Sequence, residues 1–247
     1  MMSRKIRQEM QRRQHMTSKQ VIAEIEQIEM LPSLLVMSGG LDTTTLLYLL
    51  NKFRMPLEVI SFDYGQDAVK EIEIAHYHCE QLHVKHHIVK ISETYVAGML
   101  GNDSPKENHS YTIVPNRNGI FLNIATSYAL QNGLSRVYYG AHGDIDPCYC
   151  DCSPEYIHQF NITSLLCDIR EVQVRAPFIN KTKEDILQTA LSLGVDLTKT
   201  WTCYENGEQP CGTCGGCEFR KRIEKEYVVK YSSRVREVEQ SLRNYLK

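Results

Sequence analysis

The sequence predicts an α/β fold built on a doubly wound parallel sheet, followed by a metal-binding segment towards the carboxyl end. Two observations lead to this prediction. Apolar runs typical of strands buried on both faces alternate with segments of helical periodicity from Leu34 to Leu193, which is the order of a parallel α/β sheet. Four cysteines then crowd between Cys203 and Cys217, a density typical of metal ligation in a reducing compartment.

The expected elements follow one another in a regular order after Pro32, which breaks any helix before it. Strands are predicted where short apolar runs stand between turn residues, and helices where apolar residues recur at helical spacing. The expected strands are 34–37, 57–62, 86–91, 136–140 and 172–176, and the expected helices are 42–53, 69–82, 118–131, 154–167, 183–193 and 217–245. Residues 92–114 show no period and predict a long loop of the kind that closes over a site.

Residues 1–31 stand apart from this pattern. They begin with a basic run, and Val21, Ile22, Ile25 and Ile28 then recur at helical spacing, which predicts an amphipathic helix. We therefore expect three parts. These are an N-terminal helical extension (1–31), the α/β domain (32–200) and a C-terminal zinc-binding loop with a helical segment (201–247). The extension is either a stabilising dimer helix or frayed tail, or a surface that recruits a protein partner.

The bulk composition limits the classes of function. Lys and Arg total 28 against 30 Asp and Glu, a formal charge of −2, so a nucleic-acid partner is not expected. No apolar run reaches the roughly 20 residues that cross a bilayer, so no membrane partner is expected. The first residues show no secretory signal, which favours a cytoplasmic location.

A glycine turn directly follows the first expected strand and opens a helix. Its residues are Ser38-Gly39-Gly40-Leu41-Asp42-Thr43-Thr44-Thr45. Paired glycines let the backbone approach an anion, while the hydroxyls and the helix N-terminus supply donors. Neither the Walker pattern nor the dinucleotide fingerprint fits this segment. The alternative is a tight turn with Asp42 or Thr43 as N-cap.

This loop resembles the S-G-G-x-D-S loop of PP-loop ATP pyrophosphatases, which cleave ATP between the α and β phosphates. Thr43 stands where that loop usually has Ser, so the hydroxyl is kept and a methyl group is added. The resemblance implies that ATP is a co-substrate and that AMP is transferred to an oxygen of a small substrate.

The cysteines near the end of the chain have metal-ligand spacing. Cys203, Cys211, Cys214 and Cys217 form C-x7-C-x2-C-x2-C, with glycines between them. Four thiolates close a tetrahedral shell, which predicts one structural Zn²⁺. An iron–sulfur cluster is the competing interpretation, because it uses the same ligands.

The remaining cysteines divide into two groups. The alternation over 148–152 places Cys148, Cys150 and Cys152 at every second position, either as ligands of a second metal or, as we favour, as small apolar side chains. Cys79 and Cys167 fall in helical patterns and are expected in the core.

A wider set of motifs resembles the 7-cyano-7-deazaguanine synthases, which make the nitrile precursor of queuosine. The motifs are Ser61-Phe62-Asp63-Tyr64-Gly65-Gln66, Val114-Pro115-Asn116-Arg117-Asn118, Asp151-Cys152-Ser153-Pro154-Glu155-Tyr156, Trp201-Thr202-Cys203-Tyr204 and Cys211-Gly212-Thr213-Cys214. The resemblance implies an adenine nucleotide alpha hydrolase-like fold and a ligase that forms C–N bonds. Its implied substrates are 7-carboxy-7-deazaguanine, ammonia and ATP, with Mg²⁺ on the phosphates, and its implied assembly is a homodimer.

The same resemblance implies roles for particular residues. The implied catalytic residues are Asp42, Lys183 and Arg117. The implied ATP-binding residues are Met37, Ser38, Gly39, Gly40, Leu41, Asp42, Thr43, Thr44, Thr45 and Lys183. The implied substrate-binding residues are Tyr64, Gln66, Arg117, Asn118, His142 and Asp144. Asp42 would also position Mg²⁺, Lys183 would neutralise charge on the phosphates, and Asn118 would double as a helix cap.

Two segments depart from the family pattern on the side of the substrate. Asp67 and Ala68 replace a basic residue and a histidine, and 140–146 lacks the expected asparagine-containing stretch. Adenylation is still expected, but three other functions stay open. The first is a relative that stops at the amide or joins the carboxylate to another amine, such as one on a protein. The second is a tRNA-thiolating PP-loop enzyme, and the third is a non-catalytic, zinc-stabilised interaction protein.

Overall fold

The computed structural model describes residues 30–66, 69–91, 116–143, 150–205, 207–222 and 225. The chain divides into two compact units, Met1–Trp201 and Thr202–Lys247. Nearly all of the extension expected over 1–31 and the long loop expected over 92–114 lie outside the described residues. The three-part division therefore stays a prediction. Among the described residues, none of the helices has the length and apolar character needed to cross a membrane.

The first unit is built on a parallel sheet of five strands with the order β3-β2-β1-β4-β5. The strands are β1 (Ser33–Val36), β2 (Leu57–Asp63), β3 (Lys85–Lys90), β4 (Arg136–Tyr138) and β5 (Gln173–Arg175). The chain moves from β1 outward to β3 and then returns to the other side of β1 with β4. The predicted doubly wound parallel sheet is confirmed, and its direction of winding changes between β1 and β4.

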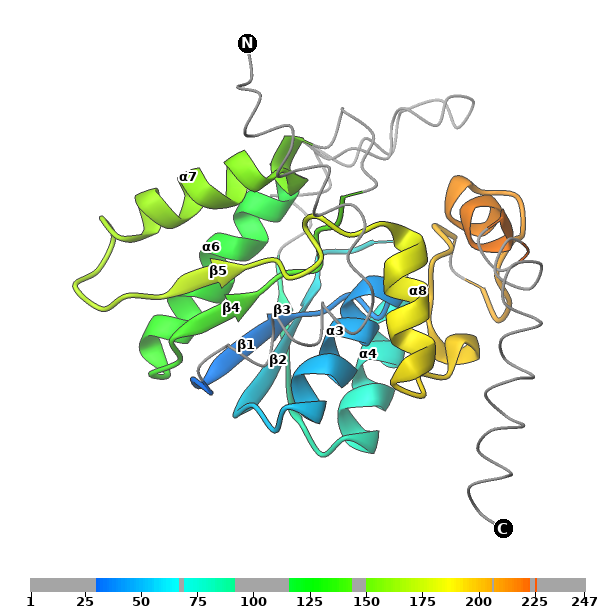
Figure 1. The fold of residues 1–247 in the computed structure, drawn as a ribbon, viewed down its shortest axis with the longest axis horizontal. Coiled ribbons are helices and arrows are strands. Elements are labelled where there is room, and N and C mark those ends of the chain that lie inside the picture. Colours follow the sequence, from blue (N-terminus) through cyan, green and yellow to red (C-terminus); the bar gives the residue numbers. More distant parts are fainter. Residues whose placement is uncertain are drawn as a thin grey trace. The chain divides into compact units, whose positions relative to one another are not determined.

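Helices cover both faces of this sheet (Figure 1). They are α3 (Leu41–Lys52), α4 (Lys70–Gln81), α6 (Arg117–Gln131), α7 (Pro154–Ser164) and α8 (Lys183–Ser192), with short 3-10 turns at Cys150–Cys152 and Leu197–Lys199. Two apolar clusters fill the layers between sheet and helices. Leu35 packs with α3, α4 and α8 on one face, and Leu34 packs with α6 on the other. Successive side chains of β1 are thus buried on opposite faces, as its uninterrupted apolar run predicts.

Helix α6 begins differently from the prediction. Asn118 was expected to cap it, but the N-cap is Asn116, which has φ 55° and makes no side-chain cap hydrogen bond. Asn118 lies inside the first turn, and its amide donates to Cys152 Sγ at 3.7 Å. The left-handed backbone at Asn116, a conformation that asparagine tolerates, starts the helix earlier than expected.

The end of α7 gives a second correction. The helix expected to run to Cys167 ends at Ser164, and Cys167 is exposed, so the prediction that it belongs to the core is wrong. Its thiol instead contacts the carbonyl of Thr163 at 3.4 Å, in the turn after the helix. Cys79 is buried, as predicted. Of the helix expected over 217–245, residues 215–222 and 225 are described and helical.

Candidate active site at the carboxyl edge of the sheet

The glycine loop connects β1 to α3 at the carboxyl edge of the sheet. Gly40 is the N-cap of α3 and makes no side-chain cap hydrogen bond, so neither Asp42 nor Thr43 caps the helix. The loop is held instead by the hydroxyls around it, because Ser38 N donates to Thr43 Oγ1 at 3.3 Å and Gly40 N donates to Ser38 Oγ at 3.4 Å. A helix N-terminus without a side-chain cap is suited to an anion.

The other residues predicted to bind ATP differ in exposure. Ser38 is exposed, Leu41 is half-buried, and Met37, Thr44 and Thr45 are buried. The Thr45 hydroxyl donates to the Leu41 carbonyl at 2.7 Å. The side chains of Thr44 and Thr45 therefore face the core, and the part of this turn available to a nucleotide is its backbone together with the exposed Ser38 side chain.

Close packing explains why this loop needs glycine. Gly39 has φ +79°, and a Cβ there would stand 2.2 Å from the carbonyl oxygen of Glu71 on α4. On the other side, a Cβ at Gly140, which follows β4, would stand 2.7 Å from the Thr43 methyl carbon. The methyl group that distinguishes Thr43 from serine thus occupies space that Gly140 leaves open.

An ion pair joins the loop to the opposite side of the site. Lys183 Nζ contacts Asp42 Oδ2, and both side chains are largely buried. Lys183 is the first residue of α8, where Thr182 and Asp185 form a capping box. Asp42 Oδ1 is buried and accepts no hydrogen bond from the described residues. A buried carboxylate oxygen of this kind suits a cation such as Mg²⁺.

The residues predicted to bind the substrate gather around the end of β2 and the start of α6. Arg117 Nη1 donates to the Tyr64 hydroxyl at 3.3 Å, and its guanidinium lies 5.8 Å from the centre of that ring. The Gln66 side chain accepts from Tyr64 N at 2.9 Å and donates to the Phe62 carbonyl at 3.1 Å. Gln66 thus shapes the turn that holds Tyr64.

A second group lies beside Asn118. Cys152 Sγ accepts a hydrogen bond from the Asn118 amide and lies 3.1 Å from the Tyr139 hydroxyl. Burial first, and then the neighbouring Cys152, raise the pKa of Tyr139 far above its usual range, so this hydroxyl stays protonated. His142 is half-buried after β4, while Asp144 lies outside the described residues.

Sequence reasoning missed Glu71 in the first turn of α4. Burial raises the pKa of its carboxyl to about 7, against the opposing charge of Arg117. The sequence holds only a weak signal for it, an acidic residue shortly after the Gln66 turn. Acidic residues at helix starts are common and mostly exposed, so the pattern alone does not single it out.

The second unit contains a separate cluster of thiols. The Sγ atoms of Cys203, Cys211, Cys214 and Cys217 all lie within 4.8 Å of one another, with Cys211 and Cys217 4.0 Å apart and Cys214 and Cys203 3.9 Å apart. Four thiolates around one Zn²⁺ stand about 3.8 Å apart, as follows from a Zn–S bond of roughly 2.3 Å. The geometry therefore fits a single tetrahedral ion.

The pKa values of two of these thiols are shifted in opposite directions. Backbone N–H groups of Thr213 and Cys214 lower the pKa of Cys211 to about 6, whereas burial raises the pKa of Cys217 to about 12. A buried thiol becomes a thiolate when a cation offsets the cost of burying its charge. The described part of the cluster is thus capable of holding a metal.

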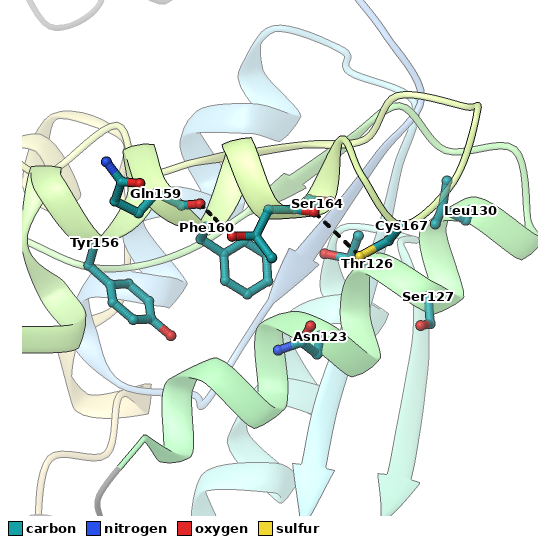
Figure 2. A pocket seen from close by; sticks show the side chains of 10 residues that line it. Asn123, Thr126, Ser127, Leu130, Tyr156, Gln159, Phe160, Ser164 and Cys167 are labelled. Carbon is teal, nitrogen blue, oxygen red and sulfur yellow. Dashed lines mark hydrogen bonds between the residues drawn. The ribbon is translucent and has the colours of Figure 1, made fainter.

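A pocket lies apart from these groups, between α6 and α7 (Figure 2). Its volume is about 290 Å³. The lining residues include Asn123 and Thr126 from α6, Phe160 from α7 and Cys167 beyond it. None of the residues predicted for the site lines this pocket, so we assign it no part in the chemistry.

Fold and site together define an ATP-using enzyme of the PP-loop class. The sequence model of one family, described as "Queuosine biosynthesis protein QueC", matches residues 32–228. The chain belongs to this family.

Individual proteins agree with this assignment. The chain is 42% identical over 200 residues to the 7-cyano-7-deazaguanine synthase of Caldicellulosiruptor saccharolyticus, covering 76% of this chain and 88% of that one. It is 34% identical over 222 residues to the same enzyme of Chromohalobacter salexigens, covering 85% and 88%. Among solved structures, NMN synthetase from Francisella tularensis matches with a TM-score of 0.53 and 16% identity over 79% of this chain and 78% of that one. This last likeness supports the fold alone.

Proposed function

We propose that this protein converts 7-carboxy-7-deazaguanine and ammonia to 7-cyano-7-deazaguanine at the expense of ATP. The observation that carries the proposal is the uncapped glycine loop with the half-buried Asp42–Lys183 pair beside it, in a chain that belongs to the queuosine family. A buried cation at a helix N-terminus stabilises charge that develops on phosphate oxygens.

The chemistry needs two rounds of adenylation at one site. In the first round the substrate carboxylate attacks the α-phosphorus of ATP, and pyrophosphate leaves. Ammonia then adds to the acyl carbon, its nitrogen loses one proton, and AMP departs with the electron pair of the C–O bond to leave an amide. In the second round the amide oxygen attacks a second ATP. The nitrogen then loses its two protons as AMP departs, and the nitrile forms.

The residues divide this work between them. We assign the pyrophosphate to the backbone of 38–43 and to Lys183, and the substrate to the group formed by Tyr64, Arg117 and Asn118. Arg117 is suited to a carboxylate, because a guanidinium binds both of its oxygens. Asp42 would hold Mg²⁺ through its buried oxygen, and the ion would neutralise charge on the phosphates.

For the second unit we propose one structural Zn²⁺ on Cys203, Cys211, Cys214 and Cys217. The sulfur atoms lie as close together as a single ion requires, which supports zinc over a cluster of several iron atoms. Because all four ligands come from protein, the ion has no open position for catalysis.

We also propose a homodimer, a cytoplasmic location, and a protein partner for the extension over 1–31. Because Asp67 and Ala68 depart from the family pattern, the alternative product is an amide or a conjugate with another amine. The glycine loop with Asp42 and Lys183 beside it argues against a non-catalytic interaction protein, because a helix N-terminus and a neighbouring cation are the groups that phosphate chemistry uses.

Product analysis tests this proposal. The purified protein is incubated with 7-carboxy-7-deazaguanine, ATP, Mg²⁺ and ammonia, and mass spectrometry follows AMP, amide and nitrile together. We expect AMP and nitrile, and a loss of about 100-fold in the Lys183→Met variant, the scale of removing one charge-stabilising group. The matched control is Lys52→Met, which changes an exposed lysine on α3. AMP with amide alone would establish the alternative product, and no AMP would contradict base activation altogether.

A further inference from the structure

The start of α4 lies directly against the phosphate loop. The backbone of Glu71 and Ala75 approaches Gly39 so closely that a Cβ there would meet the Glu71 carbonyl oxygen at 2.2 Å and Ala75 N at 3.1 Å. Glu71 is therefore fixed beside the residues to which we assign the pyrophosphate of ATP. Its position depends on backbone packing, which leaves little freedom for the helix to move away.

The Glu71 side chain interacts with the residues that we assign to the substrate. The facing titratable and charged groups among the described residues are Arg117 on α6 and Tyr64 after β2. These two residues are joined by a hydrogen bond of 3.3 Å. Burial raises the pKa of Tyr64, Arg117 lowers it, and the charge of Glu71 raises it again. The backbone of Glu71 thus packs against the phosphate loop, and its carboxylate interacts electrostatically with Arg117, the hydrogen-bond partner of Tyr64.

No hydrogen bond or ion pair within the described ranges engages the Glu71 carboxylate. Another acid of this unit shows the contrast. Glu58 contacts His87 at 2.7 Å, Tyr128 at 3.1 Å and Lys85 at 3.5 Å. The Glu58 carboxylate is thus used in contacts within the fold, whereas the lone pairs of Glu71 remain available to a ligand.

The reaction requires a base at this place. The nitrogen must lose a proton after ammonia adds, and two more as the adenylated amide becomes a nitrile. A carboxylate with its ordinary pKa is a weak acceptor, and a general base works best when its pKa lies near the working pH. Burial raises the pKa of Glu71 to about 7, which matches that requirement.

We propose that Glu71 is the general base that removes protons from the substrate nitrogen. The role rests on the proposed function. In the nitrile-forming step the N–H electron pair becomes the third C–N bond, the proton passes to the Glu71 carboxylate, and AMP leaves with the electrons of the broken C–O bond. Solvent then takes the proton before the next transfer.

Separating adenylation from nitrile formation tests this role. Glu71→Gln keeps the shape of the side chain, so we expect substrate-dependent ATP–pyrophosphate exchange within about two-fold of wild type. Nitrile formation from the added amide should fall by about 100-fold, the lower end of a general-base effect. The wild-type rate should rise with pH through about 7 and the variant rate should not. Glu73→Gln, on the exposed side of the same helix, should match wild type in every assay.

A second variant distinguishes the loss of a base from a folding defect. Glu71→Ala opens space for a small acid, so added formate should restore part of its nitrile formation. A Glu71→Gln enzyme that forms nitrile at the wild-type rate, or keeps the same inflection with pH, would overturn the role of Glu71, as would a Glu71→Ala enzyme that formate leaves unchanged. Failure of the wild-type enzyme to make any nitrile from the amide would instead contradict the proposed function on which the role depends.

Discussion

At the scale of single residues, the phosphate loop depends on a steric match between Thr43 and Gly140. A Cβ at Gly140 would stand 2.7 Å from the Thr43 methyl carbon, well inside van der Waals contact. This match explains how the loop accepts threonine where related loops have serine.

Substitution of both residues tests the match. Gly140→Ala should lower ATP–pyrophosphate exchange by about ten-fold, since a strained contact of about 1–3 kcal/mol displaces the loop. Thr43→Ser alone should have little effect, and the double variant should recover most of the loss because it removes the methyl group. Equal loss in the single Gly140→Ala and double variants would show that the two residues are not coupled.

Sequence reasoning reached some of these residues and not others. The glycine turn after a buried strand predicts an anion site from local chemistry alone. The family resemblance implied Lys183 as a phosphate ligand, and the structure pairs Lys183 with Asp42. Glu71 was missed because its distinguishing properties, backbone contact with the glycine loop and an electrostatic interaction with Arg117, come from tertiary packing and not from the local sequence. Thr44 and Thr45 were assigned to the nucleotide, but their side chains are buried, a distinction that depends on which face of α3 meets the sheet.

At the scale of elements, the start of α8 fixes the position of Lys183. Thr182 Oγ1 accepts from Asp185 N at 3.1 Å, and Asp185 Oδ2 accepts from Thr182 N at 2.9 Å. This capping box satisfies two backbone donors at the helix end.

Removal of the cap should therefore loosen both the helix and the site. We expect Thr182→Ala to lower the free energy of unfolding by about 1 kcal/mol, measured by urea denaturation. Thr182→Ser, which keeps the hydroxyl, should stay close to wild type. A Thr182→Ala protein as stable as wild type would show that the cap contributes nothing.

The packing of α4 and β3 predicts a dependence of stability on pH. His86 on β3 reaches Ser61 Oγ at 2.8 Å, and the Ser61 hydroxyl donates to the Met37 carbonyl at 2.7 Å. Burial, then the charges of His76 and His87, lower the pKa of His86 to about 4.

The direction of this pH dependence follows from how many protons the folded and unfolded chains bind at His86. Between about pH 4 and the unfolded value near 6.5, the unfolded chain binds more protons at this position than the folded chain. Stability that His86 contributes above pH 6.5 is therefore lost as the pH falls towards 4. Urea unfolding at pH 7 and pH 5 should show a smaller loss for His86→Gln than for wild type. His158→Gln, on the exposed side of α7, should keep the wild-type loss, and equal loss in all three proteins would contradict the assignment.

The elements were the most predictable part of the molecule. Every strand and helix predicted over 32–200 is present in the described residues, because buried runs and helical spacing record which faces meet the core. The first and last residues of the helices were less predictable. Asn116 caps α6 through a left-handed backbone conformation, and α7 ends at Ser164 in a turn that leaves Cys167 exposed; neither follows from periodicity.

At the scale of the whole molecule, the second unit is expected to depend on its metal. The cysteine spacing predicted the ligand set, and the structure brings the four Sγ atoms within 4.8 Å. Elemental analysis of wild type should find about one zinc per chain and no iron–sulfur absorbance. Cys214→Ser should reduce the zinc content, and Cys167→Ser, which changes an exposed cysteine of the first unit, should not. Iron in place of zinc would contradict the single-ion assignment.

The topology of the sheet explains why the residues of the glycine turn and Gly140 meet at one edge of the molecule. The direction of winding changes between β1 and β4. Thr43 lies in the first turn of α3 after β1, and Gly140 follows β4. An open α/β sheet binds its ligand at such a position. The topology therefore favours a ligand site at this edge of the sheet, which agrees with our proposal that adenylation takes place there.

The central claim is that this site transfers AMP to an oxygen of the substrate, and labelled oxygen tests it most directly. The enzyme is given ATP, ammonia and 7-carboxy-7-deazaguanine carrying ¹⁸O at both carboxylate oxygens, and mass spectrometry measures the label in AMP. Our account predicts that each nitrile forms with two AMP molecules, each carrying one ¹⁸O atom. AMP without the label, or label that passes to water, would contradict the account, because the oxygen would then leave the substrate by a route other than adenylation.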